Sequence, residues 1–421
     1  MSRVTLFAAV VWAFVSMAVA PSLSGQHILI PMDRQQANHL KAYGLTYRAL
    51  ERGEQGEWLL NYRDGAFLLP DTDALRREGA LEGVTLEPIA AMELEEIRTE
   101  IAGANMESVP LEKAPKIAVY TSPNTEPWDD AVTMVLEYAG IPYDRIWDAE
   151  VMGGGLREYE WLHLHHEDFT GQYSKSFLAY SRAAWFLEEV SMNQEEAAGL
   201  GFQSVPDLKK AVARTIRQYV ETGGFLFAMC SSTETLDLAL AAHDVDIATA
   251  FSDGTPPDAD ASSRMDWELA MAFQDGRVDL SEASNAFSDI DGHQVNTPFR
   301  KKLGVYTLFD FSAKFDPVAT MLTQAHESVI PDFYGLTTSF RLGRVKPGTI
   351  VLAKEGEFAK YVHGDLGLGT FTYFGGHDPE DPEHEVGDDP TDLSLHPNSP
   401  GYRLILNNVL FPAAKKKTLK T

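Results

Sequence analysis

The clearest hydrophobic pattern lies in the middle of the chain. Apolar residues recur at helical spacing, one every fourth position, at Leu208, Val212, Ile216 and Val220. This stripe predicts an amphipathic helix, and the glycine pair 223–224 ends it. Phe225 to Met229 is a short, unbroken apolar run, as expected of a strand buried on both faces. Cys230 follows at once, and a second helix is predicted after it.

Similar blocks alternate over the larger part of the chain. Lys116–Tyr120 and Tyr143–Trp147 have the pattern of strands, and Trp128–Ala139 between them has that of a helix ended by Gly140. Further strands are predicted at 349–353, 358–362 and 369–374, and a closing helix at 401–410. This alternation predicts an α/β fold: a parallel sheet with right-handed crossovers and helices on both faces.

The first part of the chain has a different pattern. Strands are predicted at His27–Pro31 and Leu45–Leu50, and a helix at Arg34–Ala42 between them. Asp64-Gly65 between two apolar runs predicts a tight hairpin. Met92–Ala104 has the pattern of a charged helix. We therefore expect a small α+β module over 26–110, in which no residues have catalytic spacing.

The chain begins with an apolar stretch. Arg3 precedes Val4–Val19, and Ala18-Val19-Ala20 fits a signal-peptidase site. Residues 1–20 are predicted to be a cleaved secretory signal, with an uncleaved anchor as the alternative. The mature protein would then be periplasmic or secreted, with no stable membrane span after cleavage.

These patterns divide the chain into four parts. After the signal, 1–20, comes the α+β module, 26–110. The main domain spans 115–412 and carries a large insertion at about 243–345, where the alternation is lost and a lid or specificity wall is expected. Residues 413–421 form a basic tail.

Charge narrows the range of partners. The formal net charge is −27. It excludes a nucleic-acid partner, since phosphates need Lys and Arg, and disfavours anionic membrane surfaces. The simplest explanation is a solubility surface.

Cys230 is the only cysteine, so no internal disulfide is possible. A thiol between the carboxyl end of a strand and a helix amino terminus lies near unpaired N–H groups and the positive end of the helix dipole. Both stabilise a thiolate, the nucleophilic form, and an N–H near Ser231 could hold an oxyanion. Ser231 and Glu234 have capping-box spacing. We expect the sulfur to be exposed at the rim of the sheet; the alternative is a buried, inert cysteine.

Histidines form a second notable stretch, 159–168. On a strand, Trp161, His163 and His165 share one face, and His-x-His is a plausible pair of metal ligands. The favoured interpretation is that His165, His166 and Glu167, at the end of the strand, line a pocket beside the cysteine. Ligands bind beyond the carboxyl ends of parallel strands.

Two other loops are expected at the same edge of the sheet. The turn after the first strand of the main domain, 121–126, contributes Ser122 and Asn124. The last strand runs into Gly375-Gly376-His377. A glycine pair lets the backbone turn sharply and ligands approach closely, so His377 is well sited to be the base for the cysteine.

The stretch Gly-Gly-Phe-Leu-Phe-Ala-Met-Cys-Ser-Ser, 223–232, resembles the nucleophile elbow of the class I glutamine amidotransferase-like superfamily. The resemblance covers about 115–412. It implies a flavodoxin-like fold with a cysteine on the strand–helix turn and a histidine much later. The elbow usually has small residues two positions on either side of the cysteine; here these are Ala228 and Ser232.

The resemblance also bears on a third catalytic residue. The superfamily has an acid two residues after the histidine, where this chain has Pro379. Asp378 and Glu380 flank that position, and Glu380 is the preferred candidate. The whole chain also resembles secreted bacterial proteins labelled "asparagine synthetase B". It lacks both the amino-terminal cysteine and the Ser-Gly-Gly-x-Asp-Ser nucleotide loop of asparagine synthetases.

Three functions remain open. The first is an exported hydrolase that acts on an amide or ester, with Cys230, His377 and Glu380 as its catalytic residues and Gly376 and Asp378 near the substrate, and without a metal or other cofactor. The second is a non-catalytic binding or scaffold protein on the same fold. The third is a metal-dependent hydrolase that uses His163, His165 and His377. The substrate, a small molecule or a polymer, stays unidentified.

Overall fold

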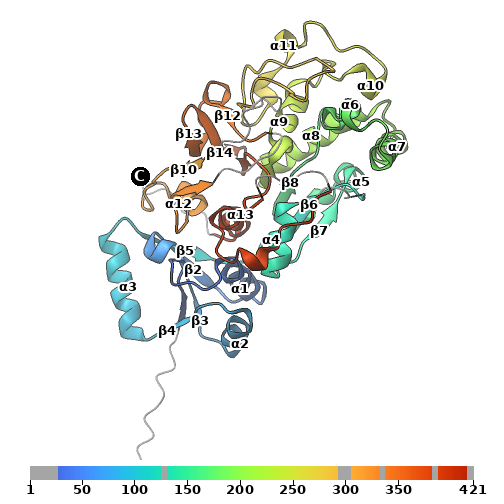
Figure 1. The fold of residues 1–421 in the computed structure, drawn as a ribbon. Helices are drawn as coiled ribbons and strands as arrows, with labels where there is room; N and C mark the ends of the chain where they lie inside the picture. Colours follow the sequence, from blue (N-terminus) through green and yellow to red (C-terminus); the bar gives the residue numbers. More distant parts are fainter. Residues whose placement is uncertain (1–26, 125–129, 293–304, 332–336, 382–386, 415–421) are drawn as a thin grey trace, which may run out of the picture.

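The protein is seen in a computed structural model that describes residues 27–124, 130–292, 305–331, 337–381 and 387–414 (Figure 1). The predicted signal segment and most of the basic tail lie outside the described residues. Within these ranges no helix has the length and apolar character needed to cross a bilayer.

The amino-terminal module contains its own five-stranded antiparallel sheet, in the order β4-β1-β3-β2-β5. Its strands are β1 (His27–Ile30), β2 (Gly56–Leu60), β3 (Ala66–Pro70), β4 (Glu87–Ile89) and β5 (Glu107–Leu111). Its helices are α1 (His39–Glu51), the 3-10 turn η1 (Tyr62–Asp64), α2 (Asp73–Glu82) and α3 (Ala91–Gly103). The α+β composition, the hairpin at Asp64-Gly65 and the charged helix over 92–104 are confirmed.

One prediction in this module is wrong. Leu45–Leu50 is not a strand but the second half of α1. The helix starts one turn later than predicted, at Asn38, whose side chain accepts a hydrogen bond from the N–H of Lys41 at 3.0 Å.

The main sheet has ten strands in the order β11-β10-β13-β14-β15-β9-β8-β6-β7, with β12 paired to β14. The parallel strands are β6 (Ile117–Tyr120), β7 (Asp144–Ile146), β8 (Trp161–Leu164), β9 (Phe225–Met229) and β15 (Gly369–Phe374). The antiparallel strands are β10 (Val305–Leu308), β11 (Val329–Pro331), β12 (Phe340–Arg341), β13 (Ile350–Glu355) and β14 (Phe358–Leu366). The fold is therefore mixed α/β, and β10 to β12, within the predicted insertion, extend the sheet.

Helices cover both faces of this sheet (Figure 1). One face packs against α4 (Ala131–Ala139) and α13 (Pro400–Leu410). The other packs against α5 (Asp148–Met152), α7 (Ala184–Gly199), α8 (Val205–Glu221) and α9 (Cys230–Ala241). Shorter pieces are η2 (Gly155–Glu158), η3 (Tyr173–Lys175), α6 (Phe177–Tyr180), α10 (Ala250–Asp253), α11 (Ala261–Arg264), η4 (Trp267–Leu269), α12 (Pro317–Leu322), η5 (Leu342–Arg344), η6 (Leu393–Leu395) and η7 (Phe411–Ala413).

The module and the main domain share a hydrophobic core. Helix α1 packs against both α4 and α13, and one apolar cluster contains residues from all three helices and from both sheets. Arg403 of α13 is fully buried there and donates hydrogen bonds to the carbonyl oxygens of Met32, at 2.8 Å, and Asp64. The two parts are thus joined by buried apolar and polar contacts.

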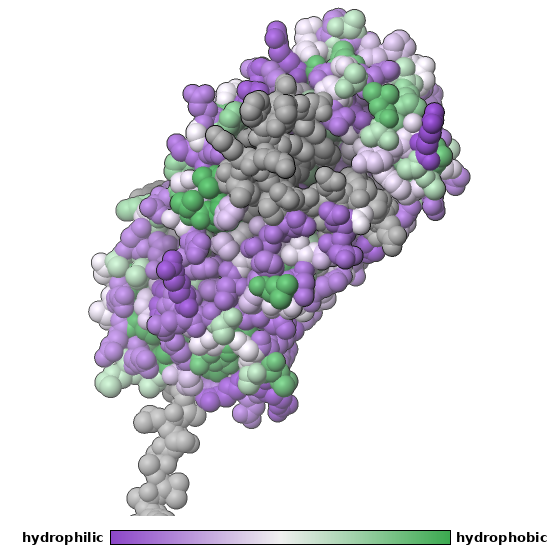
Figure 2. All heavy atoms as spheres, in the orientation of Figure 1, coloured by the Kyte–Doolittle hydropathy of each residue, from purple (hydrophilic) through white to green (hydrophobic). Residues whose placement is uncertain are grey.

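The surface agrees with the acidic composition. Figure 2 shows hydrophilic residues spread over one face of the molecule, with apolar residues in small, separate groups. Single exposed apolar side chains are normal for a soluble protein.

Candidate functional site at the carboxyl edge of the parallel strands

The predicted site residues come from loops at one edge of the main sheet. Because β6, β8, β9 and β15 run parallel, the segments that follow them meet at the same edge. These segments carry Ser122 and Asn124, His165 to Asp168, Cys230, and Gly375 to His377, respectively.

Cys230 has a strained backbone. It follows β9 directly, begins α9 and has a φ of +48°. A non-glycine residue in this region is uncommon and costs about 1–3 kcal/mol, and such residues cluster at functional sites. A nucleophile that lies on a sharp turn between a strand and a helix is known as a nucleophile elbow. The order strand, cysteine, helix is confirmed.

The exposure of Cys230 differs from the expectation. The residue is only 2% exposed and belongs to the apolar cluster on the α4 and α13 face of the sheet. The sulfur was expected at an open rim, but Cys230 and its neighbours Met229 and the first turn of α9 are all buried.

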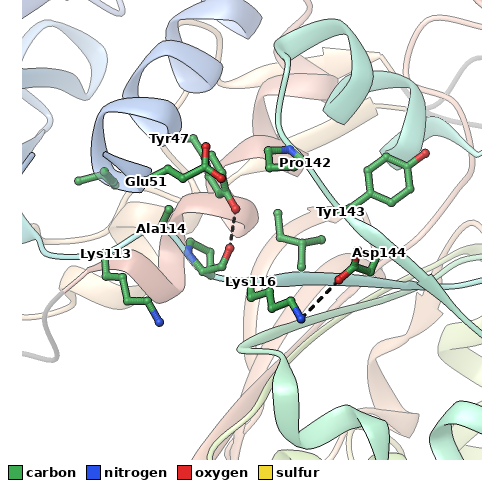
Figure 3. Close-up of a pocket in the computed structure, with 11 residues that line it drawn as sticks. Tyr47, Glu51, Lys113, Ala114, Lys116, Pro142, Tyr143 and Asp144 are labelled. Atoms are coloured by element: carbon green, nitrogen blue, oxygen red, sulfur yellow. Dashed lines mark hydrogen bonds and ion pairs between the residues drawn. The ribbon is translucent and has the colours of Figure 1, made fainter. Parts of the chain in front are cut away.

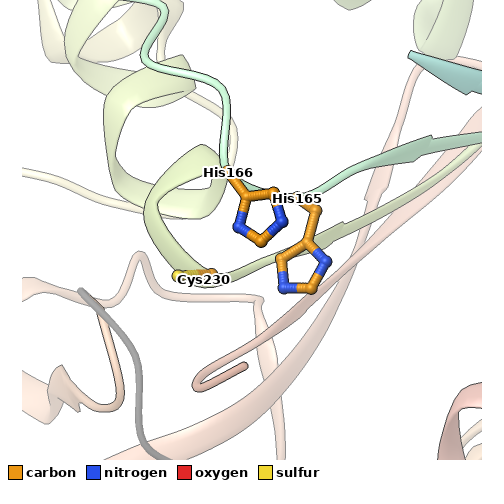
Figure 4. Close-up of side chains that lie close together, drawn as sticks. All are labelled: His165, His166 and Cys230. Carbon is orange, nitrogen blue, oxygen red and sulfur yellow. The ribbon is translucent and has the colours of Figure 1, made fainter. Parts of the chain in front are cut away.

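Imidazole rings nevertheless surround the thiol. The Cys230 sulfur and one ring nitrogen each of His165 and His166 all lie within 4.8 Å of one another (Figure 4). The His165 and His166 rings stack with centroids 4.0 Å apart, and the His377 ring lies 4.6 Å and 4.9 Å from them. The structure therefore brings together the residues predicted from three separate loops.

Asp130 is a member of the site that sequence reasoning missed. It caps α4, since its Oδ1 accepts hydrogen bonds from the N–H groups of Val132 and Thr133. The same carboxylate lies 3.2 Å from Nε2 of His163 and 3.3 Å from Nδ1 of His165. Burial raises the pKa of Asp130, but the two imidazoles outweigh burial and hold it well below its usual range. The only feature of the sequence that could have drawn attention to Asp130 was its place near the start of a predicted helix.

His163 is fully engaged within the fold. Its Nδ1 lies 3.1 Å from the carbonyl oxygen of Phe227, and its Nε2 faces Asp130. Both ring nitrogens thus have oxygen partners, and the side chain is fully buried. His163 also forms a group of possible metal ligands with Asp130 and His165, whose ligand atoms lie within 4.8 Å of one another.

The loop after β8 is hydrogen-bonded to the first turn of α9. Ser231 Oγ donates to the carbonyl of His166 at 2.9 Å, and the Ser232 N–H donates to that of His165 at 3.1 Å. The Glu167 carboxylate accepts from the His165 N–H at 2.9 Å and from Ser232 Oγ at 3.2 Å. Burial raises the pKa of Glu167. Ser231 and Glu167, predicted to bind substrate, are held in these internal contacts.

The capping-box prediction is wrong. The N-cap of α9 is Met229, which has no side-chain oxygen, and Ser231 bonds to the histidine loop instead. Glu234 accepts from Ser288 Oγ at 2.5 Å and from Thr337 Oγ1 at 3.1 Å. Burial raises the pKa of Glu234 to about 7. Sequence reasoning named Glu234 only as a helix cap and missed these contacts, since the partners are more than 50 residues away in the chain.

The glycine pair before His377 allows a close approach of three chain segments. Gly375 N–H donates to Lys360 O at 2.8 Å, and Gly376, with φ of +97°, donates to Thr337 O at 2.9 Å. A Cβ on Gly375 would lie 2.6 Å from the carbonyl oxygen of Thr338. The glycines are thus required by backbone contacts, and the close approach of a ligand stays a prediction.

The acids after His377 have partners in their own loop. The buried Asp378 carboxylate accepts from the N–H of Glu380 at 2.8 Å and from Thr391 Oγ1 at 2.6 Å. The Glu380 carboxylate lies 3.1 Å from Nδ1 of His396. A role for Glu380 as the third catalytic residue stays a prediction.

Ser122 and Asn124 lie half-buried after β6. Ser122 Oγ accepts from the N–H of Asn124 at 3.3 Å and lies 3.9 Å from the Met192 sulfur. The rest of this predicted binding loop, from 125, lies outside the described residues.

A groove is found at the opposite, amino edge of the sheet (Figure 3). It lies between α1 and the starts of β6 and β7. Tyr47 Oη donates to Pro115 O at 2.6 Å, and Lys116 Nζ lies 3.5 Å from Asp144. No predicted site residue lines it.

Comparisons with known proteins assign no family. No family model matches the chain, and no curated protein does. Solved structures that match include two proteins titled cytoplasmic from Salmonella typhimurium. STM3548 has 10% identity over 72% of this chain and 100% of its own, with a TM-score of 0.34; STM1381, from strain LT2, has 14% over 71% and 100%, with a TM-score of 0.33.

An exo-β-1,4-mannosidase, Op5Man5 from Opitutaceae bacterium strain TAV5, also matches, with 13% identity over 76% of this chain and 39% of its own, at a TM-score of 0.28. Likenesses of this size carry no argument about fold or function. The function is therefore argued from the site alone.

Proposed function

We propose that this chain is an exported cysteine-dependent hydrolase of amides or esters. The observation that carries the proposal is the geometry of Cys230, whose φ is +48° at a strand-to-helix turn and whose sulfur lies within 4.8 Å of two imidazole nitrogens. A thiol beside imidazoles and a helix amino terminus has the surroundings that favour the thiolate.

The order of the parallel strands supports a flavodoxin-like scaffold. Numbered in chain order, β6, β7, β8, β9 and β15 stand in the spatial order 2-1-3-4-5, which is that of flavodoxin-like sheets. Such sheets bind ligands outside the carboxyl ends of their strands, where Cys230 and the histidines lie. This is also the scaffold that the resemblance to amidotransferase-like proteins implies.

In the proposed reaction, the Cys230 thiolate attacks the carbonyl carbon of the substrate. The N–H of Ser231 stabilises the oxyanion, since the next N–H, of Ser232, is already bonded to His165. His377 as imidazolium gives its proton to the leaving amine or alcohol, and a thioester remains on the sulfur. Neutral His377 then takes a proton from water, the water oxygen attacks the thioester, and a carboxylic acid leaves as the thiolate is restored.

The neighbouring residues position these groups. Asp130 orients the imidazole of His165, and the contacts of Ser231, Ser232 and Glu167 fix the backbone of the histidine loop. Preorganised groups of this kind need little rearrangement during reaction.

A non-catalytic binding or scaffold protein is the second candidate. The observation that favours it is the 2% exposure of Cys230, because a substrate must reach the sulfur. The predicted alternative that uses His163 as a metal ligand is less well supported, since both nitrogens of that ring face oxygen atoms of the fold.

An acyl-enzyme experiment separates the two candidates. A generic activated ester, p-nitrophenyl acetate, is mixed with the full chain, and p-nitrophenol release is followed. A Cys hydrolase releases a burst of about one equivalent per chain before steady turnover, because the thioester accumulates. Cys230→Ala and His377→Ala remove the burst, while the control His243→Ala, which removes a histidine whose ion partner is its neighbour Asp244, keeps it.

A burst that survives in Cys230→Ala would contradict the proposal, as would the absence of any burst in wild type. Digestion and mass spectrometry locate the acetyl group, which the proposal assigns to Cys230.

Export is part of the same proposal. Fractionation of cells that express the full chain, with amino-terminal sequencing of the product, is expected to give a periplasmic or secreted protein that begins after Ala20. A cytoplasmic product that keeps Met1 would contradict it.

A further inference from the structure

The thiol and two of its neighbouring imidazoles form a ligand set that the hydrolytic proposal leaves unused. Cys230 Sγ and one ring nitrogen each from His165 and His166 lie within 4.8 Å of one another (Figure 4). They come from the ends of two adjacent parallel strands, β8 and β9. Rotation of the two side chains, whose rings are stacked, would point all three atoms at one zinc ion, at the roughly 2.0–2.3 Å that zinc takes from nitrogen and sulfur ligands.

A second observation points to a missing ligand at this place. His165 is fully buried, and neither of its ring nitrogens has a hydrogen-bond partner in the described part of the chain. Nδ1 has the Asp130 carboxylate at 3.3 Å as an ion-pair partner, so Nε2 is the ring atom that has neither a hydrogen bond nor an ion pair there. Buried polar atoms normally have partners, and an orphaned one marks an absent water or ion. A cation bound by the ring would remove the cost of leaving it unpaired.

The surroundings are those of a preorganised metal site. Ligating histidines commonly turn their other nitrogen to a carboxylate, which sets the tautomer and the ring orientation. Asp130 stands in that position beside His165. The backbones of both histidines are also fixed, because the carbonyl of His165 accepts from Ser232 and that of His166 accepts from Ser231.

We propose that Cys230, His165 and His166 bind one divalent cation of the zinc type, with a fourth position open to water. One thiolate and two imidazoles form a donor set that suits Zn²⁺ and Co²⁺ and not Mg²⁺ or Ca²⁺, which prefer oxygen. The cation displaces the thiol proton and binds the sulfur. Coordination draws electron density from the sulfur and slows its attack on a carbonyl, so the ion holds the nucleophile in a less active form. This regulatory consequence rests on the proposed hydrolase, whereas the binding itself does not.

Cobalt titration of the metal-stripped full chain tests the binding. Co²⁺ bound to a thiolate gives a sulfur-to-metal charge-transfer band in the near ultraviolet. The proposal predicts that this band saturates at about one equivalent, that Zn²⁺ removes it and that Mg²⁺ does not.

Matched variants assign the ligands. Cys230→Ser loses the charge-transfer band, and His166→Asn weakens Co²⁺ binding by at least about tenfold. Asp130→Asn, which keeps a residue that can cap α4, is expected to weaken it by roughly 10–100-fold. The control His243→Asn removes a histidine whose ion partner is its neighbour Asp244, and leaves binding unchanged. Circular dichroism checks that each variant is folded; should Cys230→Ser misfold, wild type alkylated after unfolding and refolded replaces it.

Binding without the charge-transfer band would overturn the proposal, as would unchanged affinity in His166→Asn. The two proposals fail separately. If the protein shows the charge-transfer band but no acyl burst, the proposed cation site stands and the proposed hydrolase is wrong. If the metal-free protein shows the burst but gives no charge-transfer band with Co²⁺, the proposed hydrolase stands and the proposed cation site is wrong. If both hold, one equivalent of Zn²⁺ suppresses the burst and a chelator restores it.

Discussion

At the scale of single residues, the site contains a buried acid close to its nucleophile. Glu234 lies one helical turn after Cys230 in α9, and its carboxylate accepts hydrogen bonds from the hydroxyl groups of Ser288 and Thr337. Burial raises its pKa from 4.5 to about 7. Thr337 also accepts from the N–H of Gly376, so Glu234 links the nucleophile helix to the loop of His377.

The raised pKa of Glu234 predicts a pH-dependent stability. A folded-state pKa above the unfolded value means that the folded chain holds the proton more tightly. The contribution of this group to stability is therefore complete below about pH 4.5 and is lost as the pH rises through about 7. The loss amounts to up to about 3 kcal/mol, at about 1.4 kcal/mol per pKa unit.

Urea unfolding of wild type and Glu234→Gln at pH 5 and pH 8 measures this loss. The free energy of unfolding of wild type relative to the variant is expected to be lower at pH 8 by about 2–3 kcal/mol. The control Glu96→Gln changes an exposed carboxylate of α3 and should show no such difference. An equal difference at both pH values for Glu234→Gln would contradict the assignment.

At the scale of elements, the strand–turn–helix unit at Cys230 predicts that a glycine variant is more stable than an alanine variant, the reverse of the usual order in a helix. Alanine is more favourable than glycine inside a helix by about 1 kcal/mol. At a φ of +48° the order reverses, because a Cβ is strained there by about 1–2 kcal/mol. Cys230→Gly should therefore be more stable than Cys230→Ala by about 1 kcal/mol in urea unfolding, whereas Glu96→Gly should be less stable than Glu96→Ala. Equal behaviour at both positions would show that Cys230 is an ordinary helical residue.

The glycine loop that carries His377 makes a second element-scale prediction. A Cβ on Gly375 would lie 2.6 Å from the backbone oxygen of Thr338, which cannot move aside as a side chain can. Gly375→Ala should destabilise the chain by about 2 kcal/mol and reduce the acyl burst through displacement of His377. Gly199→Ala, where nothing lies within 4 Å, is the matched control. A variant with unchanged stability and burst would mean that the loop position does not matter.

The sequence predicted some elements well for a physical reason. Phe225–Met229 is a strand at the expected bounds, because a parallel strand buried on both faces has an unbroken apolar run. Gly369–Phe374 is also a strand at the expected bounds, and it is rich in the β-branched and aromatic residues that favour strands. The same reasoning gave the wrong result for helix α1. It packs against α2, α4 and α13, so 10 of its 13 residues are buried and no polar face reveals the helical period.

The site could be predicted only as far as topology determines it. In a parallel sheet, residues that follow successive strands meet at one edge, so the gathering of Cys230, His165, His166 and His377 could be anticipated. The roles of Asp130 and Glu234 could not, because these depend on contacts between segments far apart in the chain. Burial of the sulfur also depends on tertiary packing.

At the scale of the whole molecule, the shared core predicts a single cooperative unfolding transition. One apolar cluster joins the module to the main domain, and buried Arg403 donates to Met32 and Asp64 of the module. In Trp58→Phe, which removes the buried tryptophan of β2, the fluorescence of the remaining tryptophans and far-ultraviolet circular dichroism are expected to give the same urea midpoint. A chain that starts at residue 112 should not fold alone. Two separate transitions would show independent parts.

The most direct test of the central claim, that Cys230 is an activated thiol and not an inert core residue, is the rate of iodoacetamide alkylation of the native protein between about pH 5 and pH 10. The label reports on one site, because the chain has a single cysteine. The account predicts a reactive thiolate with an apparent pKa well below about 8.5, and slower reaction near neutral pH in His377→Ala. A thiol that stays unreacted until the protein is unfolded would contradict it.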